Sequence, residues 1–197
     1  MTKLRKEIIK LTPNMMKKIE LFVDSRFAED QSLYKKRGGF KKDDLLVGAM
    51  AEVGVSKFLK GNGIKVRNPD FTIYDKSQKS YKADLTHGKK HFHVKGQSLS
   101  SANRYGGSWL MQKWDPLIST NQPEKRLNNY MVPCIVDIEK REITVYGAIS
   151  FNILVDWGCI GECSVPMFRN NKVAIYLESL ASLSTNARWG VVDRSKA

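Results

Sequence analysis

Residues 81–97 read YKADLTHGKKHFHVKGQ, and they contain all three histidines of the chain. The pair Gly88-Lys89 divides the stretch into two halves. It suits a two-residue hairpin loop, because glycine accepts the positive φ that the first central position of a II′ turn requires. Such a loop places Asp84 opposite His93. The stretch therefore predicts a β-hairpin.

In this register both halves of the hairpin sort into one polar and one apolar face, because side chains alternate along a strand. The polar face carries Lys82, Asp84, Thr86, His91, His93, Lys95 and Gln97. The apolar face carries Tyr81, Ala83, Leu85, Phe92, Val94 and Gly96. A slip of one residue would mix the two faces. The polar face brings a carboxylate, imidazoles and an amine together, which suits metal binding and the stabilisation of charge. The alternative is a hairpin with one solvated face.

The chain is strongly basic. It has 197 residues, with 33 Lys and Arg against 20 Asp and Glu, which gives a formal net charge of +13. This excess favours a polyanionic partner, with nucleic acid ahead of a membrane surface. No apolar run approaches the roughly 18 residues of a membrane span, and the first residues lack the apolar core of a signal peptide. The odd number of cysteines, three, fits a reducing compartment. We therefore expect a cytoplasmic protein.

Two helices are expected before the hairpin. Thr12-Pro13 is typical of a helix start, and residues 14–30 have apolar spacing suited to a helix. A second helix is expected from Lys42 to about Lys60, before a glycine-rich turn. Glu52 is its one charged residue between positions 45 and 56. Because a buried carboxylate is costly unless it is paired, Glu52 lies either at the edge of the apolar stripe or in a polar site.

The other segments are read as strands, one helical segment and a basic loop. Strands are expected at residues 64–68, 70–75, 130–139, 142–150 and 172–177, and partly helical structure at 108–118. The basic stretch at positions 34–42 carries Lys35, Lys36, Arg37, Lys41 and Lys42. It is either a solvated loop or a loop that contacts phosphates, since cations there can displace condensed counterions.

The order of these elements resembles the PD-(D/E)XK nuclease superfamily, which includes many restriction endonucleases and phage exonucleases. Its core is a helix with an acid, a hairpin with an aspartate and an acid-x-lysine triplet, and then a helix and a strand. GAMAEVGVSKFL is similar to the helix, with Glu52 as its acid. Asp84 resembles the hairpin aspartate, and HVKGQ stands in place of the triplet, with Lys95 as its lysine. SWLMQKWDPLI and YMVPCIVDIE are similar to the last helix and strand, so the resemblance covers about residues 42–140.

The resemblance implies a Mg²⁺ or Mn²⁺ site held by Asp84, Glu52 and the carbonyl of Val94. The bound metal would polarise the scissile phosphate and lower the pKa of a water. Lys95 would position that water or neutralise charge on phosphorus. Asp70, in the literal Pro-Asp pair upstream, is a lower-ranked ligand.

One position departs from the family pattern, because His93 stands where the triplet has its first acid. Glu52 could supply the missing carboxylate. Alternatively, His93 could ligate the metal, which favours Mn²⁺, or relay a proton. Gln97 is expected to orient the water or to contact the backbone, and the alternative is an ordinary surface amide. The departure also leaves open a site that does not cut.

The resemblance further implies a mixed α/β fold, with a restriction-endonuclease-like core in which a central mixed sheet is flanked by helices. The expected organisation is a single nuclease-like domain over 1–197, with an N-terminal helical segment at about 1–41, a core at about 42–150 and a C-terminal extension at about 151–197.

The expected function is metal-dependent hydrolysis of DNA phosphodiester bonds by an endonuclease in a bacterial cell or a phage-infected host, with a homodimer where both strands are cut. The expected DNA contacts are Lys35, Lys36, Arg37, Lys41, Lys42 and Arg104. Two alternatives stay open. One is a nuclease-like DNA-binding protein without activity. The other is a histidine-based metalloprotein using His87, His91 and His93.

Overall fold

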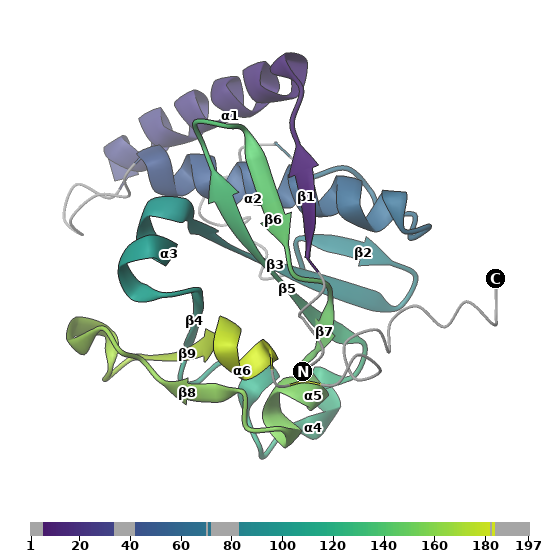
Figure 1. The fold of residues 1–197 in the computed structure, drawn as a ribbon, viewed down its shortest axis with the longest axis vertical. Helices are drawn as coiled ribbons and strands as arrows, with labels where there is room; N and C mark the ends of the chain where they lie inside the picture. The colour runs from purple at the N-terminus through teal and green to yellow at the C-terminus, as the bar shows by residue number, and fades with distance from the viewer. Residues whose placement is uncertain (1–5, 34–41, 70, 72–82, 182, 184–197) are drawn as a thin grey trace.

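A computed structural model of the protein describes residues 6–33, 42–69, 71, 83–181 and 183, and it contains two β-sheets (Figure 1). The first sheet has the strand order β1 (Glu7–Lys10), β6 (Glu142–Val145), β5 (Asn129–Asp137), β3 (Lys90–Ser98) and β2 (Leu85–His87), and β7 (Ile149–Ser150) also pairs with β5. Strands β3 and β5 are parallel, whereas the other described pairings are antiparallel. The second sheet is antiparallel, in the order β4 (Ser108–Gln112), β9 (Lys172–Tyr176) and β8 (Ile160–Glu162).

Two long helices cover the first sheet. Helix α2 (Lys42–Gly61) packs against the sheet, and α1 (Pro13–Leu33) packs on α2 (Figure 1). The shorter helices are α3 (Leu99–Tyr105), α4 (Pro123–Arg126), α5 (Phe151–Asp156) and α6 (Leu177–Ala181), with 3₁₀ turns η2 (Pro116–Ile118) and η3 (Pro166–Phe168). The protein is therefore a mixed α/β fold with a mixed sheet flanked by helices, as expected. None of the described helices has both the length and the apolar composition that a membrane crossing requires.

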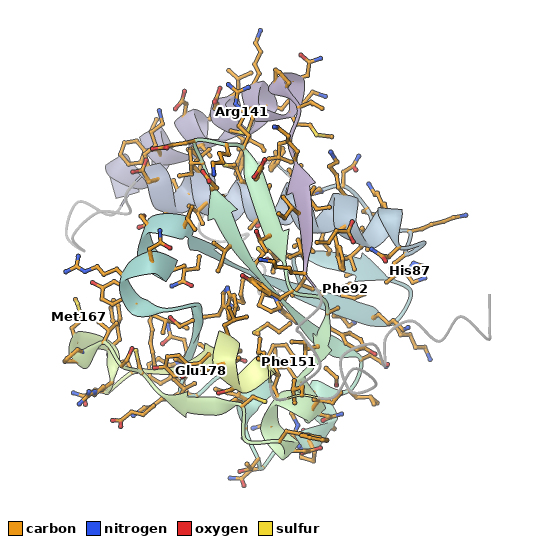
Figure 2. All side chains as sticks on the ribbon, viewed as in Figure 1. His87, Phe92, Arg141, Phe151, Met167 and Glu178 are labelled. Atoms are coloured by element: carbon orange, nitrogen blue, oxygen red, sulfur yellow. The ribbon has the colours of Figure 1, made fainter. Side chains whose placement is uncertain are left out.

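Strand β5 lies between two hydrophobic clusters. Val132 and Cys134 belong to the cluster under α2, together with Phe92 of β3. The alternate residue Met131 belongs to a second cluster, together with Phe151 and residues of the second sheet. Figure 2 shows Phe92 and Phe151 in the interior, and both side chains are fully buried. The neighbouring strand β3 contributes Phe92 and Val94 to the cluster under α2.

The hairpin register predicted from the sequence is confirmed. Strands β2 and β3 pair His87 with Lys90 and Leu85 with Phe92. Gly88 has φ +55° in the turn, as a hairpin glycine requires. Strand β2 begins at Leu85, so Asp84 lies immediately before it at the outer edge of the first sheet.

Several other elements are also where the sequence predicts them. The two expected helices correspond to α1 and α2, and Thr12 accepts a hydrogen bond from Met15 at the start of α1 (3.3 Å). The strands expected at 130–139 and 172–177 correspond to β5 and β9. Between β5 and β6 the chain turns at Arg141, which has φ +57°. The strand expected at 70–75 falls largely outside the described residues.

Four expectations are wrong in detail. Residues 108–118 begin with strand β4 instead of a helix, because Trp109 and Met111 alternate into the second cluster and β4 pairs with β9. Residues 64–68 form no strand, because the Val66 N–H donates to the carbonyl of Ile64 (3.0 Å) and not to a neighbouring strand. The strand expected at 142–150 divides into β6 and β7 around Gly147, which has φ +91°. The N-terminal segment is not only helical.

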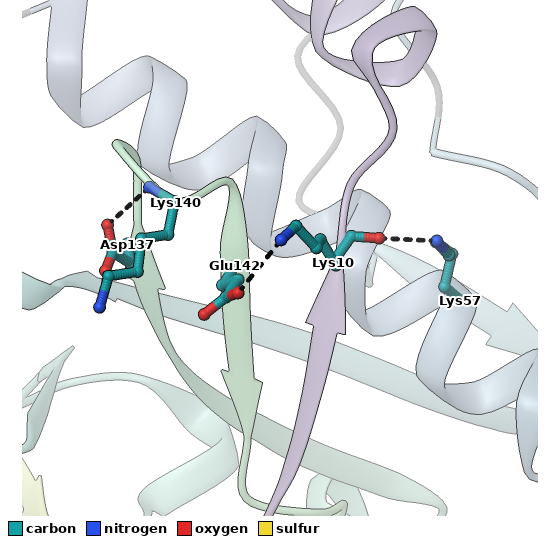
Figure 3. Close-up of polar contacts among 5 residues, drawn as sticks. All are labelled: Lys10, Lys57, Asp137, Lys140 and Glu142. Carbon is teal, nitrogen blue, oxygen red and sulfur yellow. Dashed lines mark hydrogen bonds and ion pairs between the residues drawn. The ribbon is translucent and has the colours of Figure 1, made fainter.

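Strand β1 joins the N-terminal segment to the first sheet by pairing and by side-chain contacts (Figure 3). It pairs with β6, and the Lys57 ammonium of α2 donates to the carbonyl of Lys10 (2.9 Å). The Lys10 ammonium lies 3.7 Å from a carboxylate oxygen of Glu142. Figure 3 also shows the Lys140–Asp137 ion pair (3.9 Å) at the β5–β6 turn. Residues 6–33, the described part of the N-terminal segment, therefore supply a strand of the first sheet as well as a covering helix.

Two glycines of α2 give a matched test of how closely that helix packs. A Cβ placed at Gly54 would lie 2.9 Å from side-chain atoms of Ile143, whereas one at Gly48 would meet nothing within 4 Å. We expect Gly54→Ala to lower the free energy of unfolding by about 1–3 kcal/mol, because the helix must move off the sheet. Gly48→Ala should raise it by up to about 1 kcal/mol through helix propensity. Urea unfolding followed by circular dichroism measures both, and equal effects would contradict the packing described here.

Candidate active site

The site is built around the exposed edge of β3. The Asp84 carboxylate accepts a hydrogen bond from the backbone N–H of Val94 (2.7 Å). The His91 N–H, three residues earlier, donates toward β5, to the carbonyl of Asn128 (2.8 Å). Since backbone groups alternate in direction along a strand, the N–H and the carbonyl of Val94 both face away from β5. The Asp84 carboxylate and the Val94 carbonyl therefore lie at the same edge.

Glu52 approaches this edge from α2. Its helix neighbour Ala51 is in tight contact with β3, since a Cβ at Gly96 would lie 2.8 Å from the Ala51 Cβ. Burial, followed by the negative charge of Asp84, raises the pKa of Glu52 to about 8. The hairpin and the helix therefore bring two carboxylates from distant parts of the sequence within electrostatic reach of each other.

Opposing effects act on the pKa of the Asp84 carboxylate. Burial of its carboxylate raises its pKa, although part of the residue surface stays exposed. The Val94 hydrogen bond opposes that rise, followed by the charges of His93 and Lys95. The charges that act on Asp84 thus come from His93 and Lys95 of β3, and Asp84 in turn acts on Glu52 of α2.

The polar face of β3 looks into two hollows between the first sheet and the second. The larger, of about 910 Å³, is lined by Ala83, Asp84, Thr86, His91, His93, Lys95, Gln112, Trp114, Asp115, Pro116, Leu117, Lys125 and Asn129. The smaller, of about 420 Å³, is lined in part by Lys95, Gln97, Tyr105 and Met167. Lys95 lines both hollows.

The imidazole of His93 has a defined tautomer. The Asn129 amide nitrogen donates to the carbonyls of Lys125 (2.9 Å) and Leu127 (3.1 Å), so its oxygen must face His93. That oxygen lies 2.9 Å from Nε2 of His93, which therefore carries a hydrogen. The ring also packs edge-on against Phe151. Nδ1 is then the nitrogen that remains for a proton or a metal.

Gln97 is already fully engaged with the chain that follows β3. Its amide oxygen accepts from the Ser108 N–H (2.9 Å), and its amide nitrogen donates to the Gly106 carbonyl (3.1 Å). These bonds are to the protein's own main chain, and they test neither of the roles expected for Gln97. Orienting a water directly would require breaking them.

The expected DNA contacts are only partly described. Lys42 begins α2 and forms an ion pair with Asp24 of α1, so its charge is partly neutralised. Arg104 is exposed in α3, with its guanidinium 5.0 Å from the centre of the Tyr105 ring, next to the smaller hollow. The remaining residues of the basic loop (Lys35, Lys36, Arg37 and Lys41), together with Asp70, lie outside the described residues.

The oxygen donors near this edge come from few side chains. Across the described ranges, no group of three or more His, Cys, Asp or Glu side chains is arranged to hold a metal ion. The three histidines accordingly form no such centre, and His87 bonds instead to the carbonyl of Lys65 (2.9 Å). Asp84 and Glu52, with the Val94 carbonyl, offer hard oxygen donors of the kind that Mg²⁺ and Mn²⁺ accept.

The residues of the larger hollow that were not singled out from the sequence include Trp114, Lys125 and Asn129. Trp114 and Lys125 lie in the connection between β3 and β5, Asn129 is the first residue of β5, and no periodic pattern marks them. The one available signal was the interleaving of aromatic and basic residues in QKWDP, residues 112–116.

The fold and the site define a basic, mixed α/β protein with two carboxylates and a lysine at a sheet edge beside a cavity. No protein-family model matches this chain, and no curated protein or solved structure resembles it significantly. Its function must therefore be argued from the chemistry of the site.

Proposed function

We propose that the protein is a divalent-metal-dependent nuclease that hydrolyses phosphodiester bonds of DNA, with a restriction-endonuclease-like core. The observation that carries the proposal is the Asp84 carboxylate held on the Val94 N–H at the edge of β3 (2.7 Å), with Lys95 lining the same hollow. Glu52 lies on α2 next to Ala51, where that helix packs closely on β3. Two partly buried carboxylates repel each other and are costly to ionise together. A divalent cation between them would offset both costs.

Asp84, Glu52 and the carbonyl of Val94 would hold Mg²⁺ or Mn²⁺. The metal would polarise the scissile phosphate and lower the pKa of a bound water. Lys95 lies on the same strand and lines both hollows, so its ammonium would neutralise charge that develops on phosphorus.

The residues around this centre take supporting roles. His93, with its Nε2 hydrogen bonded to Asn129, would use Nδ1 to accept or return a proton. Gln97 would act as a positioning residue that ties β3 to the start of β4.

The substrate class follows from charge. A net charge of +13 favours a polyanion, and Arg104, Lys42 and the basic loop would contact the DNA backbone. Cutting of both strands by an endonuclease would require two sites, which a cytoplasmic homodimer would supply.

The direct test is cleavage of linear, circular and branched DNA with Mg²⁺, Mn²⁺ or EDTA, using the wild type and Lys95→Ala. We expect metal-dependent cleavage that Lys95→Ala reduces by about 10²–10³-fold, because one preorganised positive charge is lost at the phosphate. Lys89→Ala is the matched control, since it removes the same charge from an exposed position in the hairpin turn. Equal loss in both variants would show that the lysine acts only through net charge.

One observation favours a second candidate, a DNA-binding protein with this scaffold and no activity. The position of the usual acid is held by His93, and its ring is already bonded to Asn129. DNA binding that persists without cleavage in either metal would support this alternative and contradict the nuclease.

A further inference from the structure

Trp114 is an exposed aromatic side chain beside the candidate active site. It lies between β4 and η2, and 68% of its surface is exposed. It lines the larger hollow, which Asp84 and Lys95 also line. An exposed large apolar side chain in a concave site is a mark of binding, since a Trp is usually well buried.

The backbone on both sides of Trp114 is anchored. The Lys113 N–H donates to the Asn171 carbonyl (3.0 Å), and the Asp115 N–H donates to the Gln112 carbonyl (3.0 Å). The Asp115 carboxylate caps η2 by accepting from the Leu117 N–H (3.0 Å). The backbone that carries the indole is therefore fixed before any ligand arrives.

The rest of the hollow is suited to a nucleotide. Its volume of about 910 Å³ is at the upper end of the range for small-molecule pockets. Lys95, Lys125 and His91 supply positive or polar groups, while Pro116 and Leu117 supply an apolar wall. Cations for phosphate and an aromatic face for a base are the combination that binds single-stranded nucleic acid.

We propose that this hollow holds one unpaired nucleotide next to the scissile phosphate, with its base stacked on Trp114. The inference rests on the proposed function, since the nucleotide is part of the DNA that is cut. A base inside an intact duplex has both faces covered by its neighbours and cannot stack on the indole. The preferred substrate is therefore DNA that is single-stranded, gapped or frayed at the cutting site.

The test measures binding apart from cleavage. In EDTA, a fluorescein-labelled oligo-dT of about 12 nucleotides is titrated with the wild type, Trp114→Ala, Trp114→Phe and Trp157→Ala, and anisotropy gives each Kd. We expect Trp114→Ala to weaken binding about 5- to 150-fold, the loss of one base–aromatic stack. Trp114→Phe should keep most of the affinity. Trp157 is 58% exposed at the end of α5, outside the residues that line the hollow, so Trp157→Ala should bind like the wild type.

An abasic scan makes the test specific for stacking. One base of the oligonucleotide is removed at each position in turn, for both the wild type and Trp114→Ala. At one position the wild type should lose affinity while Trp114→Ala loses none, because the partner base and the indole act as a pair. Unchanged binding by Trp114→Ala, or an equal loss at every position, would overturn the inference. So would tighter binding of a blunt duplex of the same length.

The two proposals can fail separately. Trp114-dependent binding of the single strand without cleavage in Mg²⁺ or Mn²⁺ would support the nucleotide pocket and contradict the nuclease. Metal-dependent cleavage that Trp114→Ala leaves unchanged on single-stranded, gapped and duplex DNA would support the nuclease and overturn the pocket.

Discussion

Asp84→Asn should reduce metal-dependent DNA cleavage by about 10³-fold or more. The asparagine can still accept the hydrogen bond from Val94, so the hairpin edge should keep its shape. What is lost is a negatively charged metal ligand, and metal catalysis is worth several kcal/mol of transition-state stabilisation. The measurement is the rate of plasmid nicking and linearisation at saturating Mg²⁺ and Mn²⁺.

Asp156→Asn is the matched control for this variant. Asp156 is exposed at the end of α5, so its substitution makes the same change in charge outside the candidate site. We expect it to cut like the wild type. Cleavage by Asp84→Asn at the wild-type rate would remove Asp84 from the metal site and contradict the proposed mechanism.

Glu52→Gln should stabilise the metal-free protein at pH 8 by about 2–4 kcal/mol. The pKa of Glu52 is raised from about 4.5 to about 8 on folding, so the folded state holds a proton that the unfolded chain has already released. Wild-type stability is therefore highest below about pH 4.5 with respect to this group, and it falls as the pH rises toward about 8. Glutamine cannot ionise and removes that loss.

Urea unfolding at several pH values in EDTA measures this difference. Adding Mg²⁺ should stabilise the wild type at pH 8 and should stabilise Glu52→Gln much less, because the cation would bind the ionised pair. Glu139→Gln, at an exposed position after β5, should leave the pH dependence as in the wild type. If the free energy of unfolding of Glu52→Gln changed with pH as that of the wild type does, Glu52 would be solvated in the folded state.

The parts of the structure that could be predicted from sequence are those with a local cause. The faces of the hairpin follow from the alternation on either side of Gly88, and α2 follows from its apolar spacing and the glycines after Lys60. Glu52 could be suspected because one carboxylate in an apolar helix needs a partner. Asp84 could be matched to His93 because the turn fixes the register.

The parts that could not be predicted depend on contacts between distant segments. Residues 108–112 form a strand because β9, far along the chain, pairs with them. Their alternating pattern is short enough to be read as a helix. Asn129 orients His93 only because β5 lies parallel to β3. The sequence places Gln97 on a polar face, but it does not show that Ser108 lies beside Gln97 and bonds to it.

The parallel pairing of β3 and β5 also bears on how the protein is made. The connection between these strands contains β4, and the described partner of β4 is β9. During synthesis, Glu52, Asp84 and Lys95 leave the ribosome well before residue 172. Their edge of the first sheet therefore exists before β4 has β9 as its hydrogen-bonded partner. Non-local pairings of this kind form late and slowly. A nascent chain stalled before β9 would therefore expose the apolar side chains of Trp109 and Met111, and chaperones bind exposed apolar surface of this kind.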